Sequence, residues 1–280
     1  MGLAELAPDP LRRWDIVTPS LPGPPGVIMS GFTDRSTAPL DLDVVPYPSV
    51  TIAIDLCDDL IVVDETADRD QSGTAVFGLG PRSVRAMGQS VRCMQVRMSP
   101  VMAHSVLGTA SDLDGELVGL DDLWGREASL LREQLRDAPT WDARFAIAGA
   151  AISQRVEAGR AVDPELAFTW EQMVDSHGQI RVGNIADDLG WSRKRLWSRF
   201  RSQLGLTPKR AAQLIRFDRA AHRLAAGHSP ASVAAECGYA DQSHLHREVS
   251  SFTGQRPSAV SSAPWLAVDH VAWTPQIQTL

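Results

Sequence analysis

The stretch SRKRLWSRFRSQLGLTPKR, residues 192–210, holds seven cationic side chains and no acidic one in nineteen positions. The chain as a whole is acidic, with 34 Asp and Glu, 27 Lys and Arg and a formal net charge of −7 over 280 residues. Residues 1–180 contain 27 acidic and 14 basic side chains, whereas residues 181–260 contain 6 and 13. This asymmetry predicts two modules with different partners, of which the basic one suits a polyanion.

The basic stretch belongs to a unit that occurs twice. Residues 185–208, IADDLGWSRKRLWSRFRSQLGLTP, align with residues 233–257, VAAECGYADQSHLHREVSSFTGQRP. The offset is 48 residues up to the first matched glycine and 49 beyond it, so the second copy has one extra residue in its turn. The matched pairs are Ala186 and Ala234, Gly190 and Gly238, Leu196 and Leu245, Phe200 and Val249, Gly205 and Gly254, and Pro208 and Pro257.

Each copy predicts a helix-turn-helix. A small alanine lets two helices cross closely, and Gly190 or Gly238 supplies the positive φ needed to leave the first helix. Ser192 and Asp241 are suitable N-caps for the second helices. Between the copies, a long helix is expected to begin at Thr207-Pro208. The expected buried stripes are Leu196, Phe200 and Leu204 in the first copy, and Leu245, Val249 and Phe252 in the second.

The outward faces of the two second helices carry the candidate DNA-binding residues. These are Ser192, Arg193, Lys194, Arg195, Trp197, Ser198 and Arg201, then Lys209 and Arg210 at the start of the long helix, and Gln242, Ser243, His246 and Arg247 in the second copy. Lys194, Trp197, Gln242 and Arg247 are expected to contact base edges, and the remaining cations to neutralise phosphates. Trp197 is equally suited to pack on the long helix. For Gln242 the alternative is to cap its own helix, and base readout is favoured over it.

With this repeat, residues 178–262 resemble the two-fold helix-turn-helix module of the AraC/XylS family of transcriptional regulators. The resemblance implies two recognition helices that enter successive major-groove faces about 34 Å apart. It also implies an N-terminal domain for effector sensing or dimerisation, often a cupin-like β-barrel. The expected partners are double-stranded DNA, RNA polymerase, a second copy of the chain, and an effector that is a small molecule or a protein.

The sequence departs from the family pattern at three positions. Ser198 stands where relatives often have arginine, Val249 where an aromatic residue is usual, and Ser250 where a basic residue is common. The second recognition helix is therefore expected to contribute less affinity than the first. On this view Arg247→Ala weakens binding less than Lys194→Ala.

The first half of the chain predicts short strands, and the middle predicts helices. The expected strands are 26–34, 49–56, 60–65, 74–80 and 90–100, and the expected helices are 126–137, 140–158 and 164–176. The predicted fold class is therefore α+β with two domains, the first of them β-rich and open to a cupin-like form. Residues 1–177 are expected to form a regulatory or dimerisation domain, β-rich over 1–100 and helical over 101–177. Residues 178–262 are expected to form the all-α DNA-binding domain, and residues 263–280 a C-terminal tail.

Catalytic, metal and cofactor chemistry find little support in the sequence. His104 is the only histidine before His177, and the spacing of Cys237, His244 and His246 matches no usual zinc pattern. We therefore expect no metal and no cofactor. Three widely spaced cysteines argue against a disulfide framework and fit a reducing cytoplasm.

The sequence favours a cytoplasmic, sequence-specific transcriptional regulator that is not an enzyme and does not enter a membrane. It leaves open whether the protein activates or represses. One alternative is a cupin-like enzyme, or a repair protein with a reactive Cys57 or Cys93, joined to a DNA-binding domain. The other is a regulator without a ligand, whose N-terminal half serves only to dimerise or to bind a protein.

Overall fold

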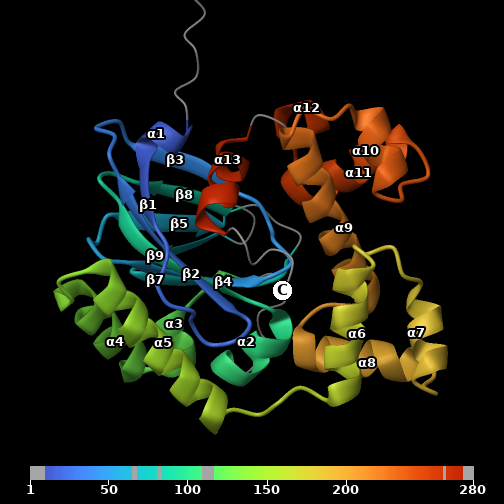
Figure 1. Cartoon of the computed structure of the whole chain (residues 1–280), viewed down its shortest axis with the longest axis horizontal. Coiled ribbons are helices and arrows are strands. Elements are labelled where there is room, and N and C mark those ends of the chain that lie inside the picture. Colours follow the sequence, from blue (N-terminus) through green and yellow to red (C-terminus); the bar gives the residue numbers. More distant parts are fainter. Residues whose placement is uncertain (1–9, 65–67, 81–83, 109–116, 261–262, 274–280) are drawn as a thin grey trace, which may run out of the picture.

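The computed structural model describes residues 10–64, 68–80, 84–108, 117–260 and 263–273, which form a β-rich lobe and a helical lobe (Figure 1). The β-rich lobe contains a six-stranded antiparallel sheet of order β1-β2-β9-β4-β7-β10 and a four-stranded one of order β3-β8-β5-β6. The strands are β1 Trp14–Val17, β2 Val27–Asp34, β3 Leu40–Val44, β4 Val50–Asp55, β5 Leu60–Asp64, β6 Arg69–Ser72, β7 Thr74–Phe77, β8 Val84–Gly88, β9 Arg92–Met98 and β10 Leu117–Gly119. Two facing antiparallel sheets are the arrangement of jelly rolls and cupins.

Alternation along the central strands gives the six-stranded sheet two buried faces. In the β2–β9 pair Met29 lies opposite Val96 and Ser30 opposite Gln95, so neighbouring positions point to opposite sides. One set of side chains packs toward the four-stranded sheet: Ile28, Phe32, Cys93 and Ala75 with Leu60, Val62 and Ala86. The other set packs toward helices: Val27, Met29, Ile52, Val76, Met94, Val96 and Met98.

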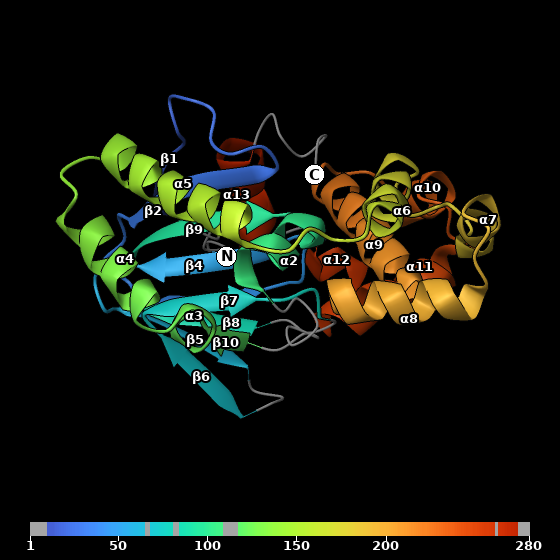
Figure 2. The same ribbon diagram turned by 90° about the horizontal axis from the view of Figure 1, so that it is seen from below.

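Helices of the middle segment cover that second face of the sheet (Figure 2). They are α2 Pro100–Leu107, α3 Leu120–Trp124, α4 Arg126–Asp137 and α5 Trp141–Ala158, and a short helix α1 Pro10–Arg13 precedes β1. Gly31 in β2 permits the close approach of α5, because a Cβ there would lie 2.4 Å from the Trp141 ring. The expected helices 126–137 and 140–158 thus appear as α4 and α5.

The helical lobe contains both copies of the repeat. Its helices are α6 Pro164–Asp175, α7 Val182–Asp188, α8 Arg193–Leu204, α9 Pro208–Ala225, α10 Pro230–Glu236, α11 Gln242–Thr253 and α12 Pro257–Val260. Together with the β-rich first half, this arrangement confirms the α+β fold class. Helix α6, which the expected boundary after residue 177 assigns to the first domain, lies among these helices and contacts α8 and α9 (Figure 1).

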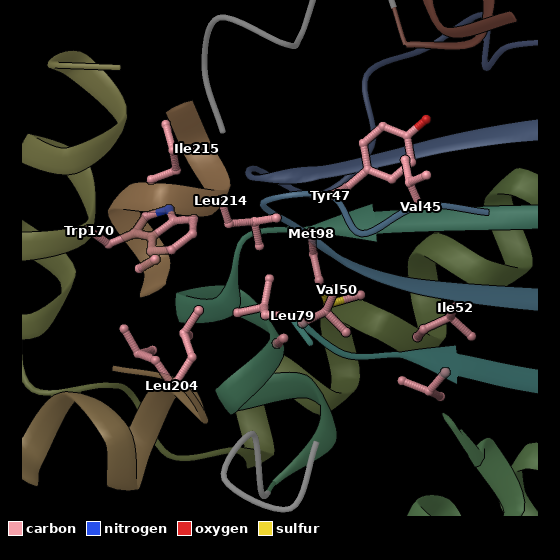
Figure 3. Close-up of a cluster of buried hydrophobic side chains, with 14 of the residues drawn as sticks. Val45, Tyr47, Val50, Ile52, Leu79, Met98, Trp170, Leu204, Leu214 and Ile215 are labelled. Carbon is pink, nitrogen blue, oxygen red and sulfur yellow. The ribbon is translucent and has the colours of Figure 1, made fainter. Parts of the chain in front are cut away.

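The two lobes share one apolar core. Figure 3 shows Trp170, Leu214 and Ile215 of the helical lobe opposite Val50 and Met98 of the β-rich lobe, all of them buried. Helix α2 contacts both α6 and α8 at this junction. The lobes are therefore docked through apolar contact, which disfavours free movement between them.

The segment after the repeat returns to the β-rich lobe. Residues 263–280 were expected to be a tail, but helix α13, Pro264–Ala272, contacts α1, β1, β3 and α9. Trp273 and Ala272 are each 1% exposed and belong to the core between the two sheets. The segment docks as a helix because burying these apolar side chains against the sheets stabilises the contact.

Candidate nucleic-acid interface

The first copy of the repeat folds as a helix-turn-helix made of α7 and α8. Gly190 leaves α7 with a φ of 63°, as the sequence predicts. The Ser192 hydroxyl accepts a hydrogen bond of 3.2 Å from the Arg195 backbone N–H and caps α8. Leu196, Phe200 and Leu204 are at most 1% exposed. The buried stripe and the cap together fix which face of α8 points outward.

The outward face of α8 carries Lys194, Trp197, Ser198 and Arg201. These positions are spaced by three, one and three residues, so they lie on one side of a helix, and all four side chains are exposed. Trp197 retains 42% of its accessible surface, which is high for so large an apolar side chain. An exposed face of this composition suits a major groove, where cations and hydroxyls meet base edges and phosphates.

Three other arginines of the basic stretch contact the protein itself. Arg195 stacks over Trp191, with its guanidinium carbon 4.2 Å from the ring centre. The Nε atom of Arg199 donates to Asp163 at 3.0 Å, at the start of α6. Arg193 lies against α7, because a Cβ on Gly183 would be 2.9 Å from its guanidinium. The high density of cations thus serves the packing of the helical lobe as well as its surface charge.

The second copy repeats the geometry with α10 and α11. Gly238 has a φ of 75°, and Asp241 caps α11 by accepting 2.7 Å from the His244 backbone N–H. Gln242, Ser243, His246 and Arg247 are exposed on α11. His244 instead faces its own turn, where Nδ1 lies 3.4 Å from the Ala240 N–H.

A buried ion pair, which the sequence analysis missed, holds α11 against α9. Glu248 is 4% exposed and accepts from Arg216 Nε at 3.0 Å and from Gln213 Nε2 at 3.3 Å. Burial opposes the charge of Arg216, but the Glu248 carboxylate outweighs it and raises the pKa of the guanidinium. The sequence does contain a signal for this ion pair, because Glu248 lies between Leu245 and Val249 in an otherwise apolar stripe. A glutamate that is buried in such a stripe requires a cationic partner.

Lys209 and Arg210 lie in the first turn of α9, which begins at Pro208 after the N-cap Thr207. Lys209 is exposed, whereas Arg210 is half-buried with its guanidinium carbon 3.8 Å from the centre of the Phe252 ring. Burial lowers the pKa of Arg210. The structure gives Arg210 a role in packing α9 on α11, and the phosphate contacts of both residues stay a prediction.

A second candidate site is a cavity of about 700 Å³ between the lobes. Tyr47 and Arg97 line it from the β-rich lobe, and Ile215, Arg219 and His222 from α9, with Asp269 of α13 beside them. Its size is within the range of small-molecule pockets. A smaller cavity of about 100 Å³ between the two sheets shares the lining residues Tyr47, Ser49 and Arg97 with it.

Two carboxyl groups lie beside His222 in this cavity. Its Nε2 lies 3.1 Å from Asp269 Oδ2 and its Nδ1 lies 3.6 Å from Asp218 Oδ1. Burial disfavours the imidazolium, but the two carboxylates outweigh it and raise the pKa of His222 to about 9. Burial also raises the pKa of Asp218. His222 is therefore cationic at neutral pH.

Two capped helix-turn-helix units with exposed polar faces define a DNA-binding protein of the tandem helix-turn-helix class. Residues 185–263 match a protein-family model described as a helix-turn-helix domain. The domain is of the AraC type, and the chain is a DNA-binding transcriptional regulator. Among proteins with curated functions, none matches the sequence.

The chain is also similar to several solved structures. ToxT from Vibrio cholerae O395 is 11% identical with a TM-score of 0.48, over 86% of this chain and 98% of that one. Unsaturated fatty acid-bound wild-type ToxT from Vibrio cholerae strain SCE256 is 12% identical with a TM-score of 0.47, over 85% and 96%. The AraC-like transcriptional activator CuxR is 14% identical with a TM-score of 0.25, over 75% and 86%.

Within the described ranges, two further kinds of site are absent. No helix there combines the length and apolar character that a membrane crossing requires. Among the same residues, no three His, Cys, Asp or Glu side chains cluster in a way that could hold a metal ion.

Proposed function

We propose that the regulator reads one operator through both of its helix-turn-helix units. Helix α8 presents Lys194 and Trp197 to base edges in one major-groove face, and α11 presents Gln242 and Arg247 to the next. The observation that carries this proposal is that both helices bury their apolar stripes and leave these side chains exposed. Exposed Arg and Lys side chains of the helical lobe then supply the phosphate contacts that position the protein.

The proposal includes an effector that acts through the β-rich lobe. The cavity between the lobes supports it, because an occupant would touch Arg97 on β9 and His222 on α9 at once. A ligand that prefers one arrangement of these elements shifts the population toward that arrangement. RNA polymerase and a second copy of the chain are further expected partners of the proposal, and the cytoplasm is its expected location.

The alternative of a repair protein takes Cys57 or Cys93 as its reactive thiol. Cys57 is partly exposed, and the burial of Cys93 counts against Cys93 in that role. Cys93 is 4% exposed in β9, and burial raises the pKa of its thiol to about 12. A thiol with this pKa is protonated at neutral pH and is a poor nucleophile.

The test is the selection of bound fragments from random duplex DNA by the full chain. We expect one motif with two half-elements about one helical turn, roughly 10 base pairs, apart. Enrichment of a single half-element would show that α11 only positions the protein. Absence of any enriched motif, with weak binding that ignores sequence, would contradict the proposal.

A further inference from the structure

Helix α13 places a buried carboxylate at the junction of the two lobes. Asp269 is 1% exposed, and its Oδ2 accepts a hydrogen bond of 2.9 Å from the Tyr47 hydroxyl of the β-rich lobe. The same oxygen lies 3.1 Å from His222 Nε2 on α9. Its Oδ1 lies 3.6 Å from Arg97 Nη1 on β9. One side chain thus joins the linker of the two DNA-reading units to the sheet.

The groups around Asp269 are themselves held in place. The Arg97 guanidinium carbon lies 3.8 Å from the Tyr47 ring centre and 4.0 Å from that of Trp273, so the cation stacks on a ring of the β-rich lobe and on a ring at the end of α13. The Ser30 hydroxyl of β2 donates 2.5 Å to the Ala272 carbonyl at the end of α13. These contacts order both the helix and the cations that it meets.

Helix α13 connects the two lobes at one end of their junction, where Gln255 also donates a hydrogen bond of 3.2 Å to Asp43. The apolar contact of α2 with α6 and α8 lies at the opposite end (Figure 1). At the α13 end, apolar contacts of Leu266 are joined by the charges of Asp269, His222 and Arg97. This end is the weaker point, because part of its energy depends on ions that solvent can also stabilise. Loss of the Asp269 contacts would therefore open the junction at the α13 end.

The charges of the lobes give this opening a consequence for DNA. Residues 1–160, which include the β-rich lobe up to α5, contain 23 acidic and 14 basic side chains, whereas residues 161–260 of the helical lobe contain 10 and 13. Docking holds the acidic lobe beside the basic DNA-reading helices, and its field opposes the approach of a polyanion. Moving the acidic lobe away would remove part of this repulsion.

We propose that α13 is an autoinhibitory latch, closed by Asp269, that holds the acidic lobe against the DNA-binding helices and lowers their affinity for DNA. The effect on DNA rests on the proposed function, whereas the latch itself does not. A ligand in the cavity between the lobes acts on this latch directly, because Asp269, His222 and Arg97 all line that cavity.

The test compares full-length Asp269→Asn with the unaltered chain. Asparagine keeps the shape of aspartate but loses the attraction to Arg97 and His222, so amide exchange over residues 263–273 should accelerate by about tenfold or more. The affinity for a duplex of random sequence should rise several-fold at low salt and less at high salt. His222→Gln, which removes the partner charge from α9, should act in the same direction.

Asp70→Asn is the charge-matched control. Asp70 is exposed on β6, at the sheet edge opposite β3, which α13 contacts. It should leave both exchange and DNA affinity close to those of the unaltered chain. Unchanged exchange in Asp269→Asn would overturn the latch. Faster exchange without a gain in affinity would overturn autoinhibition. A chain that binds no duplex in any form would instead contradict the proposed function, while the exchange data would still decide on the latch.

Discussion

At the scale of residues, the basic stretch 192–210 contains cations in two different situations. Arg195 and Arg199 are held by an aromatic ring and a carboxylate of the protein, so they contribute a fixed positive potential. Lys194 and Lys209 extend from exposed positions at the starts of two helices. Lys194 belongs to the recognition helix α8, whereas Lys209 belongs to the linker α9. The two lysines are therefore a matched pair for separating base readout from phosphate contact.

We predict that Lys194→Ala reduces sequence preference more than overall affinity, whereas Lys209→Ala weakens all sequences about alike. A lost base contact costs about 1–3 kcal/mol on the preferred motif only, and a lost phosphate contact also lowers the salt slope by about 0.9. Titration of the selected and a scrambled duplex at several salt concentrations measures both. Equal loss of preference in both lysine variants would remove this division of roles.

Arg210→Ala should also weaken binding to DNA of any sequence, and it should lower the melting temperature because the Arg210 side chain stacks on Phe252.

At the scale of elements, the turn glycines fix the angle at which each recognition helix leaves its partner. Gly190 has a φ of 63°, and a Cβ there would meet no atom within 4 Å. Substitution at this position therefore tests backbone conformation without a clash. Gly149, inside α5, has ordinary helical backbone, and a Cβ there would make contacts of 3.7 and 3.8 Å with Pro24 and Met29.

We predict that Gly190→Ala lowers the free energy of unfolding by about 1–2 kcal/mol, because an L side chain is strained in the left-handed region. Gly190→Asn should cost less, since asparagine tolerates this conformation. Gly149→Ala should leave stability unchanged or raise it by up to about 1 kcal/mol. Denaturant unfolding of the three variants measures these differences. An alanine at 190 that unfolds like the unaltered chain would show that the turn relaxes to another geometry.

The elements of the helical lobe could be predicted because the repeat doubles every signal. Caps, turn glycines and apolar stripes occur at matched positions in both copies, and the structure has α7, α8, α10 and α11 where they predict. The expected strands 26–34, 49–56, 60–65, 74–80 and 90–100 appear as β2, β4, β5, β7 and β9. The expected strands do not include β1, β3, β6, β8 or β10. For β3 and β6 the reason is that aspartate alternates through one and polar residues fill the other, which is usual for exposed edges.

Some parts of the candidate sites depend on contacts between distant segments. Glu248 pairs with Arg216 across 32 positions, and Asp269 meets Tyr47 across 222. Neither pair leaves a periodic pattern in the sequence. Helix α13 was expected to be a tail for the same reason, since its burial depends on sheets formed at the other end of the chain. Local patterns thus predicted the DNA-reading faces, whereas the cavity between the lobes required the folded chain.

At the scale of the whole molecule, the shared core determines where the DNA-binding module can be separated. Leu166, Trp170 and Met173 of α6 are at most 2% exposed and belong to the core that includes α8 and α9. Asp163, the N-cap residue of α6, accepts from Arg199 on α8, and its backbone N–H donates 2.8 Å to Gln203. A fragment that starts at residue 178 exposes the apolar surface that these contacts cover.

We therefore predict that fragment 162–262 is more stable than fragment 178–262. Each large apolar side chain that α6 buries is worth about 1.5–3 kcal/mol, so removal of the helix should lower the melting temperature clearly or unfold the domain. Both fragments, where folded, should bind duplex DNA with log K falling by about 0.9 per phosphate contact for each unit of log salt. Thermal unfolding and salt titration of the two fragments measure this. Equal melting temperatures would place α6 with the regulatory lobe, and a flat salt response would contradict phosphate contacts as the source of affinity.

Fragment 162–262 should also bind DNA more tightly than the full chain when both are measured at low salt, because the fragment lacks the acidic lobe that opposes the polyanion.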